Sequence, residues 1–550
     1  MKIFEKIKSN KKRSGLIISI VIIVIGVIPL IFLTFWADPE HPYTIEQTTL
    51  TSGDGTKIVA FVYTPLQVSG NHPGVVVGHG GNGNKNHMQG LSIDLVKRGF
   101  TVVTIDFRGH GSSEGYRAES SKLDLDMIAA IEYLEGLGNI NKIGLVGHSM
   151  GGGTAYRVTE SDPDRIDAMV AIGALRSDVH TNVLLAVGRF EQGATEIRAL
   201  TTLSAITGQD NMETGVLYGN FSEKTACKVV VGNSEHLFEP QDYTIVYETV
   251  QWFELAFNGE EATDVVVTVF YFQFSYVITL FGVVALFFVL IVYLSYYIFK
   301  KDYVYPEKDI LKDTSILKLI IYYLICASII GFIVFLFLSD FFTSIIPISS
   351  SDETFSFILG NSIGIIIIYY LSTLRNERLS LKDIQVNFKE MCSPNYSRSI
   401  LFGIIAALLA ATFITTISHW STFTSILTVR EIGTVLAFSL IHFPFLLIKE
   451  FYFRTIQGHL KTPNKIKEYS QMTVIGIFID NILFVPVMLL QWGSSGLALS
   501  LTVLILFSMI QQVLVTWVYM YSGRNILGST IFLCIFYSWM TVNFFSFGVN

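Results

Sequence analysis

A serine enclosed by small residues is the most informative chemical feature of this sequence. Ser149 stands in GHSMG at 147–151, directly after the apolar run 143–146 and before a helical pattern over 152–161. This G-x-S-x-G spacing between a strand and a helix is typical of a nucleophile elbow, a strained turn that lifts a serine hydroxyl above the sheet edge. The N-terminus of the following helix would place backbone N–H groups beside that hydroxyl. The stretch predicts a nucleophilic serine, and the alternative is a glycine-rich turn without chemistry.

Backbone donors for a developing oxyanion are predicted at two places. The stretch HGGNGN at 79–84 follows a predicted strand, and its glycines allow the backbone to turn N–H groups towards the serine. Together with the N–H of Met150, an N–H of Gly81 or Asn82 would complete a two-donor oxyanion hole. We take Gly81 and Met150 as the pair, and the alternative is a flexible glycine–asparagine loop.

Two further side chains are suited to serve the serine as base and as orienting acid. His236 lies in the loop after a predicted strand at 228–232, from which a histidine can reach over the sheet. Glu191 follows a predicted strand at 183–187, and its carboxylate would fix the imidazole tautomer. Asp178, after the preceding strand, is the alternative acid, and Glu191 could instead be a solvated surface residue. The chain order of serine, acid and histidine is that of one fold class in particular.

Alternating strand and helix patterns position these residues within 37–264. The inner strands are continuous β-branched runs, and the alternation favours a mostly parallel sheet with helices on both faces. The first two strands flank Gly-Asp-Gly at 53–55 and predict an antiparallel hairpin. The predicted strands are 47–51, 57–64, 74–78, 101–106, 142–147, 168–172, 183–187 and 228–232, and the predicted helices are 88–98, 122–134, 152–161, 195–207 and 243–257.

Five motifs within 45–258 resemble those of the α/β-hydrolase superfamily, especially its serine-aminopeptidase-like and dienelactone-hydrolase-like branches. The resemblance implies an α/β fold with an eight-stranded sheet, a Ser149–His236–Glu191 triad, and ester, thioester or peptide bonds as substrates. It implies no metal and no organic cofactor. Glu191 departs from the aspartate that is usual at its position. The motifs are HGGNGN at 79–84, DFRGHGSSEG at 106–115, GHSMGG at 147–152, GRFE at 188–191 and NSEH at 233–236, of which the second is expected to be a structural loop.

Composition and charge divide the chain into a soluble block and a membrane block. Of its 550 residues 51% are hydrophobic, and a mean hydropathy of +0.50 is too apolar for a purely soluble protein. Residues 37–264 carry 15 Lys and Arg against 30 Asp and Glu, a net charge of −15, whereas the remainder carries 23 against 15, a net charge of +8. Nothing in this distribution suggests nucleic-acid binding. Cys227 is the only cysteine of the soluble block, which excludes a disulfide inside it.

Nine apolar segments are long enough to span a bilayer. Lys and Arg concentrate in every second loop, so the positive-inside rule places the N-terminus in the cytoplasm and the soluble block outside the cell membrane. We therefore predict a basic cytoplasmic segment at 1–14, an anchor at 15–36, an extracytoplasmic domain at 37–264 and an all-α multi-pass domain at 265–550 with about eight helices. Those eight spans are placed at 272–299, 316–338, 355–374, 400–419, 431–448, 472–492, 497–520 and 526–547.

Three ionisable residues of the membrane block are functional candidates, because charged groups inside a bilayer are costly. Asp480 lies near the middle of one predicted span, and Glu450 and Arg454 end another at i,i+4 spacing. The stretch KEFYFR at 449–454 resembles the glutamate–arginine motif of CAAX-protease-like membrane peptidases, although Lys replaces its first glutamate and its histidine motifs do not follow. The plainer interpretations are an ion pair and a helix–helix hydrogen bond.

Taken together, these features favour a membrane-anchored serine hydrolase at the outer face of the cell membrane. His236 would take the proton of Ser149, the serine would attack an acyl carbonyl, and water would release the acyl-enzyme. The substrates would be acyl esters, lipids or peptides, and transfer of the acyl group to an alcohol is a variant. The alternative function is a transporter or sensor whose hydrolase-like outer domain binds ligand without turnover. The presence of every triad member favours the enzyme, whereas the substrate, protein partners and oligomeric state are not identified.

Overall fold

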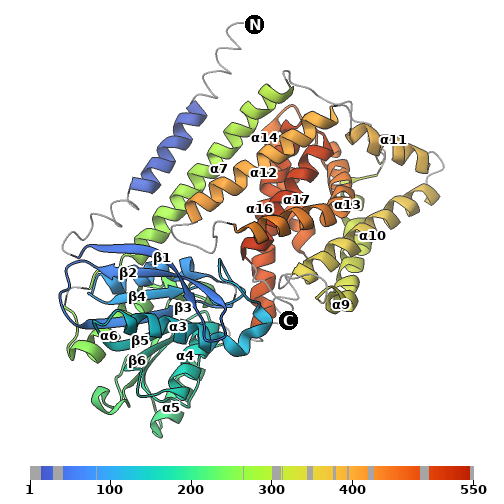
Figure 1. Cartoon of the computed structure of the whole chain (residues 1–550). Coiled ribbons are helices and arrows are strands. Elements are labelled where there is room, and N and C mark those ends of the chain that lie inside the picture. Colours follow the sequence, from blue (N-terminus) through green and yellow to red (C-terminus); the bar gives the residue numbers. More distant parts are fainter. Residues whose placement is uncertain are drawn as a thin grey trace.

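An α/β domain and a set of long helices make up the chain (Figure 1). The α/β domain lies at the lower left of Figure 1, and the long helices fill the right of the view. This computed structural model describes residues 14–28, 41–81, 83–191, 193–263, 265–299, 311, 314–343, 351–375, 380–392, 395–418, 427–482 and 495–544.

An eight-stranded sheet forms the centre of the α/β domain, with the strand order β1-β2-β4-β3-β5-β6-β7-β8. β1 pairs antiparallel with β2, β2 pairs antiparallel with β4, and every other neighbouring pair is parallel. The mostly parallel sheet and the opening hairpin predicted from the sequence are therefore confirmed. The strands are β1 (Tyr43–Thr51), β2 (Lys57–Pro65), β3 (His72–Gly78), β4 (Thr101–Ile105), β5 (Ile140–His148), β6 (Ala168–Ile172), β7 (Asn182–Gly188) and β8 (Cys227–Gly232).

Helices cover both faces of this sheet. Alternate side chains of a strand point to opposite faces, so Val76 of β3 packs in one apolar core while Val75 and Val77 pack in the other. Burial of each such valine contributes about 1.5–3 kcal/mol. The first core contains residues of α3 (Leu123–Gly136), α4 (Met150–Ser161) and α5 (Glu196–Thr207), and the second contains residues of α2 (Gln89–Val96) and α6 (Tyr243–Asn258).

Among the residues that the structure describes, the helical part contains six helices that are long and apolar enough to cross a membrane. These six match six of the nine predicted spans; of the other three, 15–36 and 472–492 are described only in part, and in the region of 497–520 there is a shorter apolar helix at Ile505–Tyr521. The orientation of the helices and the domain boundaries stay predictions. The six are Phe274–Phe299, Ile316–Leu338, Phe355–Leu374, Tyr396–Thr416, Val429–His459 and Ile526–Asn543, within or equal to α7 (Val269–Phe299), α8 (Ile316–Tyr322) with η5 (Tyr323–Ser328) and α9 (Ile329–Thr343), α10 (Ser351–Arg375), α12 (Tyr396–Ser418), α13 (Val429–His459) and α17 (Ile526–Phe544).

α7 joins the two parts, and a buried carboxylate caps its first turn. The side chain of Asp94 in α2 accepts hydrogen bonds from the N–H groups of Thr268, at 3.0 Å, and Val269, at 3.2 Å. A negative charge at a helix N-terminus is favourable, because the unpaired N–H groups there carry partial positive charge. Burial raises the pKa of Asp94 to about 6, although the hydrogen bonds from Thr268 act in the opposite direction.

α13 extends well past the predicted end of its span. The sequence predicts an end at residue 448, but the helix continues to His459, so that Glu450 and Arg454 lie inside it. At its other end, the Arg430 guanidinium lies 5.0 Å from the centre of the Tyr116 ring in the α/β domain. Pro444 lies within the helix, where it lacks the N–H that would bond to the carbonyl four residues earlier.

Candidate active site

A strained turn presents Ser149 between β5 and α4. β5 ends at His148 and α4 begins at Met150, so the serine is the single residue of the turn. Its φ of 51° and ψ of −108° lie outside the regions that residues with a side chain usually adopt. A hydrogen bond of 2.7 Å from its N–H to the Ile172 carbonyl helps to hold this conformation. The backbone here has the geometry that the G-x-S-x-G spacing predicts.

Glycines flank the serine because the backbones cross too closely for a side chain. A Cβ on Gly147 would lie 2.3 Å from the backbone of Gly151, and a Cβ on Gly151 would lie 2.5 Å from the carbonyl oxygen of Gly78 in β3. A Cβ on Gly152 would lie 2.6 Å from the side chain of Ala174. The residue types of the motif therefore follow from the close packing of α4 against the sheet.

His236 reaches the serine from the loop after β8. It opens the short helix η4 (His236–Gln241), which follows the end of β8 at Gly232. Its Nε2 atom lies 2.9 Å from the Oγ of Ser149, within hydrogen-bonding distance. This is the pair of atoms between which a general base would take the serine proton.

Glu191 lies on the opposite side of the same imidazole ring. Its Oε2 is 2.6 Å from Nδ1 of His236, and its Oε1 accepts hydrogen bonds from the N–H groups of Gly193, at 2.7 Å, and Ala194, at 3.0 Å. Burial raises the pKa of Glu191, but the contact with His236 and these two N–H donors outweigh it and hold that pKa below its usual value. The structure thus brings Ser149, His236 and Glu191 together in one chain of contacts.

Asp178, the alternative acid, has a different environment. Its side chain is 52% exposed and forms an ion pair of 2.6 Å with Arg176. The hydrogen bond from Arg176 lowers the pKa of Asp178, as expected for a surface carboxylate beside a guanidinium. The contacts of Asp178 are with Arg176 at the surface. Of the two predicted acids, Glu191 is therefore the one that contacts the imidazole.

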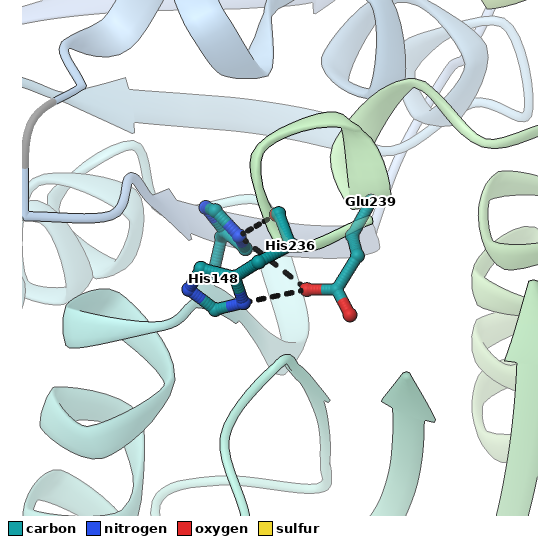
Figure 2. Close-up of side chains that lie close together, drawn as sticks. All are labelled: His148, His236 and Glu239. Atoms are coloured by element: carbon teal, nitrogen blue, oxygen red, sulfur yellow. Dashed lines mark hydrogen bonds and ion pairs between the residues drawn. The ribbon is translucent and has the colours of Figure 1, made fainter. Parts of the chain in front are cut away.

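A second carboxylate beside the imidazole was missed in the sequence. Glu239 is fully buried; its Oε2 lies 3.3 Å from Nδ1 of His236 and 3.5 Å from Nε2 of His148 (Figure 2). Its Oε1 accepts a hydrogen bond of 2.6 Å from the N–H of Gly188. The only signal was HLFE at 236–239, a three-residue spacing that places both side chains on one face of a helical turn. Because the sequence predicts a loop around His236, this helical spacing does not single out Glu239.

His148, which precedes the serine, completes the surroundings of the imidazole. Its Nε2 lies 2.9 Å from the carbonyl oxygen of His236, and the two ring centres are 4.9 Å apart. Burial lowers the pKa of His148 more than the neighbouring Glu239 raises it, which favours the neutral form of this ring. For His236, burial likewise acts to lower the pKa, but the contacts with Glu191 and Glu239 outweigh it and raise the pKa to about 10.

Met150, one predicted oxyanion donor, directly follows the serine, and the loop that carries the other, Gly81, approaches the serine at Gly80. Met150 is the first residue of α4, so its N–H has no partner within the helix. A Cβ on Gly80 would lie 3.4 Å from the Cβ of Ser149, which shows how closely the loop after β3 approaches. His110 Nε2 lies 2.7 Å from the carbonyl oxygen of Gly81 and helps to fix that loop. Asn82, the other predicted donor, lies outside the described residues.

The loop 106–115 is built from buried ion pairs, as expected for a structural element. The Asp106 carboxylate accepts hydrogen bonds from the backbone N–H of Lys85, at 2.7 Å, and from its ammonium, at 2.5 Å. Arg108 forms an ion pair of 2.6 Å with Asp126 of α3, and both side chains are fully buried. These contacts fix the loop beside the site and leave neither Asp106 nor Arg108 free for chemistry.

One group of described residues has the composition of a metal site, namely His148, His236 and Glu239. Their potential ligand atoms all lie within 4.8 Å of one another. The Nδ1 atom that His236 would offer is the one that contacts Glu191 at 2.6 Å, so a metal there would compete with that carboxylate. We therefore assign the group to the hydrogen bonding around the imidazole.

The intramembrane candidates are ion-paired inside the helical part. Arg454 and Glu450 lie 2.9 Å apart on α13 and both side chains are buried, which is the plainer of the two interpretations offered by the sequence. Asp480, in α14 (Lys465–Asn481), contacts Lys449 at 2.9 Å, Gln512 at 2.7 Å and the Tyr323 hydroxyl at 3.3 Å. Asp480 therefore connects its own helix with three other helical segments. The plainer interpretation predicts a single helix–helix hydrogen bond.

Comparison with known proteins agrees with the fold. Residues 73–201 match the sequence family described as alpha/beta hydrolase fold. An uncharacterised protein of Mycobacterium tuberculosis is 28% identical over 146 residues, 26% of this chain and 40% of the relative. A protein of Danio rerio named sn-1-specific diacylglycerol lipase is 34% identical over 128 residues, 22% of this chain and 39% of the relative. The chain thus spans about 40% of the length of these relatives.

Solved structures of esterases are also similar to this chain. An esterase of Pyrococcus furiosus is 18% identical, with a TM-score of 0.32, and the match covers 40% of this chain and 96% of that protein. The esterase Est1E of Butyrivibrio proteoclasticus is 17% identical, with a TM-score of 0.31, and the match covers 39% of this chain and all of that protein. At such values the activities of these enzymes say nothing about the activity of this chain.

Proposed function

We propose, from the α/β-hydrolase fold of residues 43–258, that the chain is a serine hydrolase that cleaves acyl bonds through an acyl-enzyme. The observation that carries the proposal is the chain of contacts from Ser149 Oγ to His236 Nε2, at 2.9 Å, and from His236 Nδ1 to Glu191, at 2.6 Å. This is the arrangement of nucleophile, base and orienting acid that a serine hydrolase requires.

Each residue has a distinct part in the proposed mechanism. His236 takes the proton of Ser149 as the hydroxyl oxygen attacks the acyl carbonyl. The N–H groups of Gly81 and Met150 donate to the oxyanion of the tetrahedral intermediate. Glu191 holds the ring with its Nδ1 protonated and stabilises the imidazolium, which then gives its proton to the leaving group. Water, activated by the same base, releases the acyl group.

The substrate class follows from this chemistry and from the long apolar helices. Esters, including those of lipids, are the first candidates, since the zebrafish relative is named a diacylglycerol lipase, and peptide bonds are the second. Transfer of the acyl group to an alcohol would use the same acyl-enzyme. The basic residues of alternate loops favour an orientation in which the α/β domain lies at the outer face of a cell membrane.

The proposal is tested by labelling with a charged, membrane-impermeant fluorophosphonate probe. Intact cells that express the full chain are expected to give a labelled protein, and His236→Ala is expected to lose most of the label, since the serine then lacks its base. Labelling only after lysis would support the hydrolase function but would place the α/β domain on the inner side of the membrane. Folded protein that stays unlabelled in both conditions would exclude a serine hydrolase.

Gly173 provides a further test, because it leaves room for the imidazole. Its φ is +61°, and an added Cβ would lie 2.3 Å from Oε2 of Glu239 and 2.7 Å from Cε1 of His236. Gly173→Ala is expected to displace the ring and to lower kcat/KM for an acyl ester about 100-fold, the usual effect of a misplacement near 1 Å. Gly153→Ala in α4 is the control, since its added Cβ meets nothing within 4 Å. Equal rates for both variants, per labelled site, would show that His236 is not the base.

A transporter or sensor is the second candidate, and buried charges of the helical part favour it. Within the described ranges of this part, three ion pairs have both partners at most 13% exposed: Lys449 with Asp480, Arg454 with Glu450, and Arg524 with Glu468. Charges buried among apolar helices commonly mark an ion or substrate path. Under this function the folded α/β domain binds ligand, and the fluorophosphonate labels it neither in intact cells nor after lysis.

A further inference from the structure

One buried carboxylate beside the proposed triad has no part in the mechanism above. Glu239 is fully buried, which is costly for a charged side chain without partners. We propose that Glu239 is a positioning residue, which holds the Nδ1 edge of His236 together with Glu191 and links it to His148. This inference rests on the proposed hydrolase function and adds a fourth side chain to its machinery.

The contacts of Glu239 reach three different segments. Its Oε1 accepts the N–H of Gly188 at the end of β7, at 2.6 Å, and its Oε2 faces Nδ1 of His236, at 3.3 Å, and Nε2 of His148, at 3.5 Å. Figure 2 shows the Glu239 carboxylate pointing towards both rings. Gly173 closes the remaining side, because a Cβ there would lie 2.3 Å from Oε2. The carboxylate is therefore closely packed at the carboxyl ends of the strands, fixed by a backbone donor and by the close approach of Gly173, which directly follows β6.

A second carboxylate at Nδ1 of His236 is not needed to orient the imidazole ring. Glu191 alone, at 2.6 Å, suffices to fix the tautomer of His236. The titratable groups that face the ring are Glu191 from the loop after β7, Glu239 and Glu235 from its own segment, and Ser149 with His148 from the end of β5. The second carboxylate adds negative charge where the imidazolium forms, so it stabilises the protonated ring in the transition state and in the resting enzyme alike.

The Glu239 charge is therefore expected to lower the rate at low pH and to raise it at high pH. Only the unprotonated ring can take the proton of Ser149, so the activity rises as the pH passes the pKa of His236. With two carboxylates at the ring, this rise is expected above the usual histidine value near 6.5. Removal of the Glu239 charge lowers that pKa, so the rise moves to lower pH. At high pH the same change costs rate, because the imidazolium of the transition state loses a partner.

The test is the pH profile of kcat and KM for wild type, Glu239→Gln and the control Glu235→Gln, each per fluorophosphonate-labelled site. Glu239→Gln is expected to move the acid side of the kcat/KM profile down by about one pH unit or more, as for the loss of one close opposite charge. Its plateau kcat is expected to fall several-fold with KM unchanged. Glu235→Gln removes a charge from the same segment, and a smaller shift is expected, because no contact of its carboxylate with the imidazole nitrogens is present in the described residues.

Specific results would overturn the proposal. A Glu239→Gln profile that coincides with that of wild type, with only a lowered plateau, would reduce Glu239 to a packing role. If the variant fails to fold, the wild-type profile decides, since a rise near pH 6.5 would contradict a ring held by two carboxylates. These results differ from a failure of the hydrolase function itself, in which wild type would neither be labelled nor turn over an ester, and the inference would fall with it.

Discussion

Ser149→Ala is expected to remove the hydrolase activity almost completely, by about 10⁶-fold in kcat, the loss that follows deletion of the nucleophile in a serine hydrolase. The reason is chemical, because alanine leaves His236 and the oxyanion donors in place without an atom that can attack the carbonyl. A residual rate above that of water is expected from those groups alone. The measurement is hydrolysis of a short acyl ester by the purified full chain, together with fluorophosphonate labelling.

A folding control separates this loss from damage to the turn. Ser149 has a φ of 51°, so any residue with a side chain bears the same backbone strain, and alanine changes only the hydroxyl. Ser161→Ala, at the far end of α4, is the matched control and is expected to keep full labelling. Persistent turnover in Ser149→Ala, at more than a thousandth of the wild-type rate, would assign the nucleophile to another residue.

Asp126→Ala is expected to lower the free energy of unfolding of the α/β domain by about 3 kcal/mol, since the buried guanidinium of Arg108 then keeps only the partly exposed Asp54, 2.8 Å away, as an ion-pair partner. Asp126 and Arg108 are both fully buried and lie 2.6 Å apart, and the Arg108 backbone N–H also donates to Asp126 at 3.0 Å. Loss of this carboxylate frees the loop 106–115 next to the site. The measurement is denaturant unfolding of the full chain in detergent, followed by the fluorescence of the buried Trp252.

A surface pair offers the comparison for this prediction. Asp178→Ala breaks an ion pair of the same 2.6 Å length, but its side chain is 52% exposed, so a change of at most about 1 kcal/mol is expected. The double variant Asp126→Ala with Arg108→Met is expected to recover part of the loss, because the buried guanidinium that has lost its buried partner is gone. Equal destabilisation by Asp126→Ala and Asp178→Ala would show that burial of the Arg108 pair is unimportant for stability.

The sequence predicted those features that depend on local spacing. Ser149, the eight strands and the glycines of the elbow depend on residues within a few positions of one another, so local sequence patterns predict them. Glu191 and His236 were also named, because each follows a strand whose carboxyl end must meet the same edge of a parallel sheet. The sequence family match at 73–201 contains Ser149 and Glu191 but ends before His236, whose loop is marked in the sequence by its position and by the NSEH motif at 233–236.

What the sequence could not predict depends on contacts between distant segments. Glu239 gains its position because η4 packs against the ends of β6 and β7, more than 50 residues earlier along the chain. The span placed at 431–448 was predicted to end before Glu450 because charged residues follow. In the structure the helix continues, since Arg454 and the Ser529 hydroxyl bond to the Glu450 carboxylate. In both cases a charge is buried by partners that no local pattern reveals.

α13 contacts both parts of the molecule. Of its 31 residues, 15 precede Pro444 and 15 follow it, so the residue that lacks a backbone N–H lies at the centre of the helix. In its first turn Arg430 contacts the ring of Tyr116, whose neighbour Arg117 lies 3.9 Å from the Cβ position of Gly81, and its second half carries the ion pairs of Lys449 and Arg454. A single helix therefore extends from the buried ion pairs of the helical part to the residues beside the loop of Gly81.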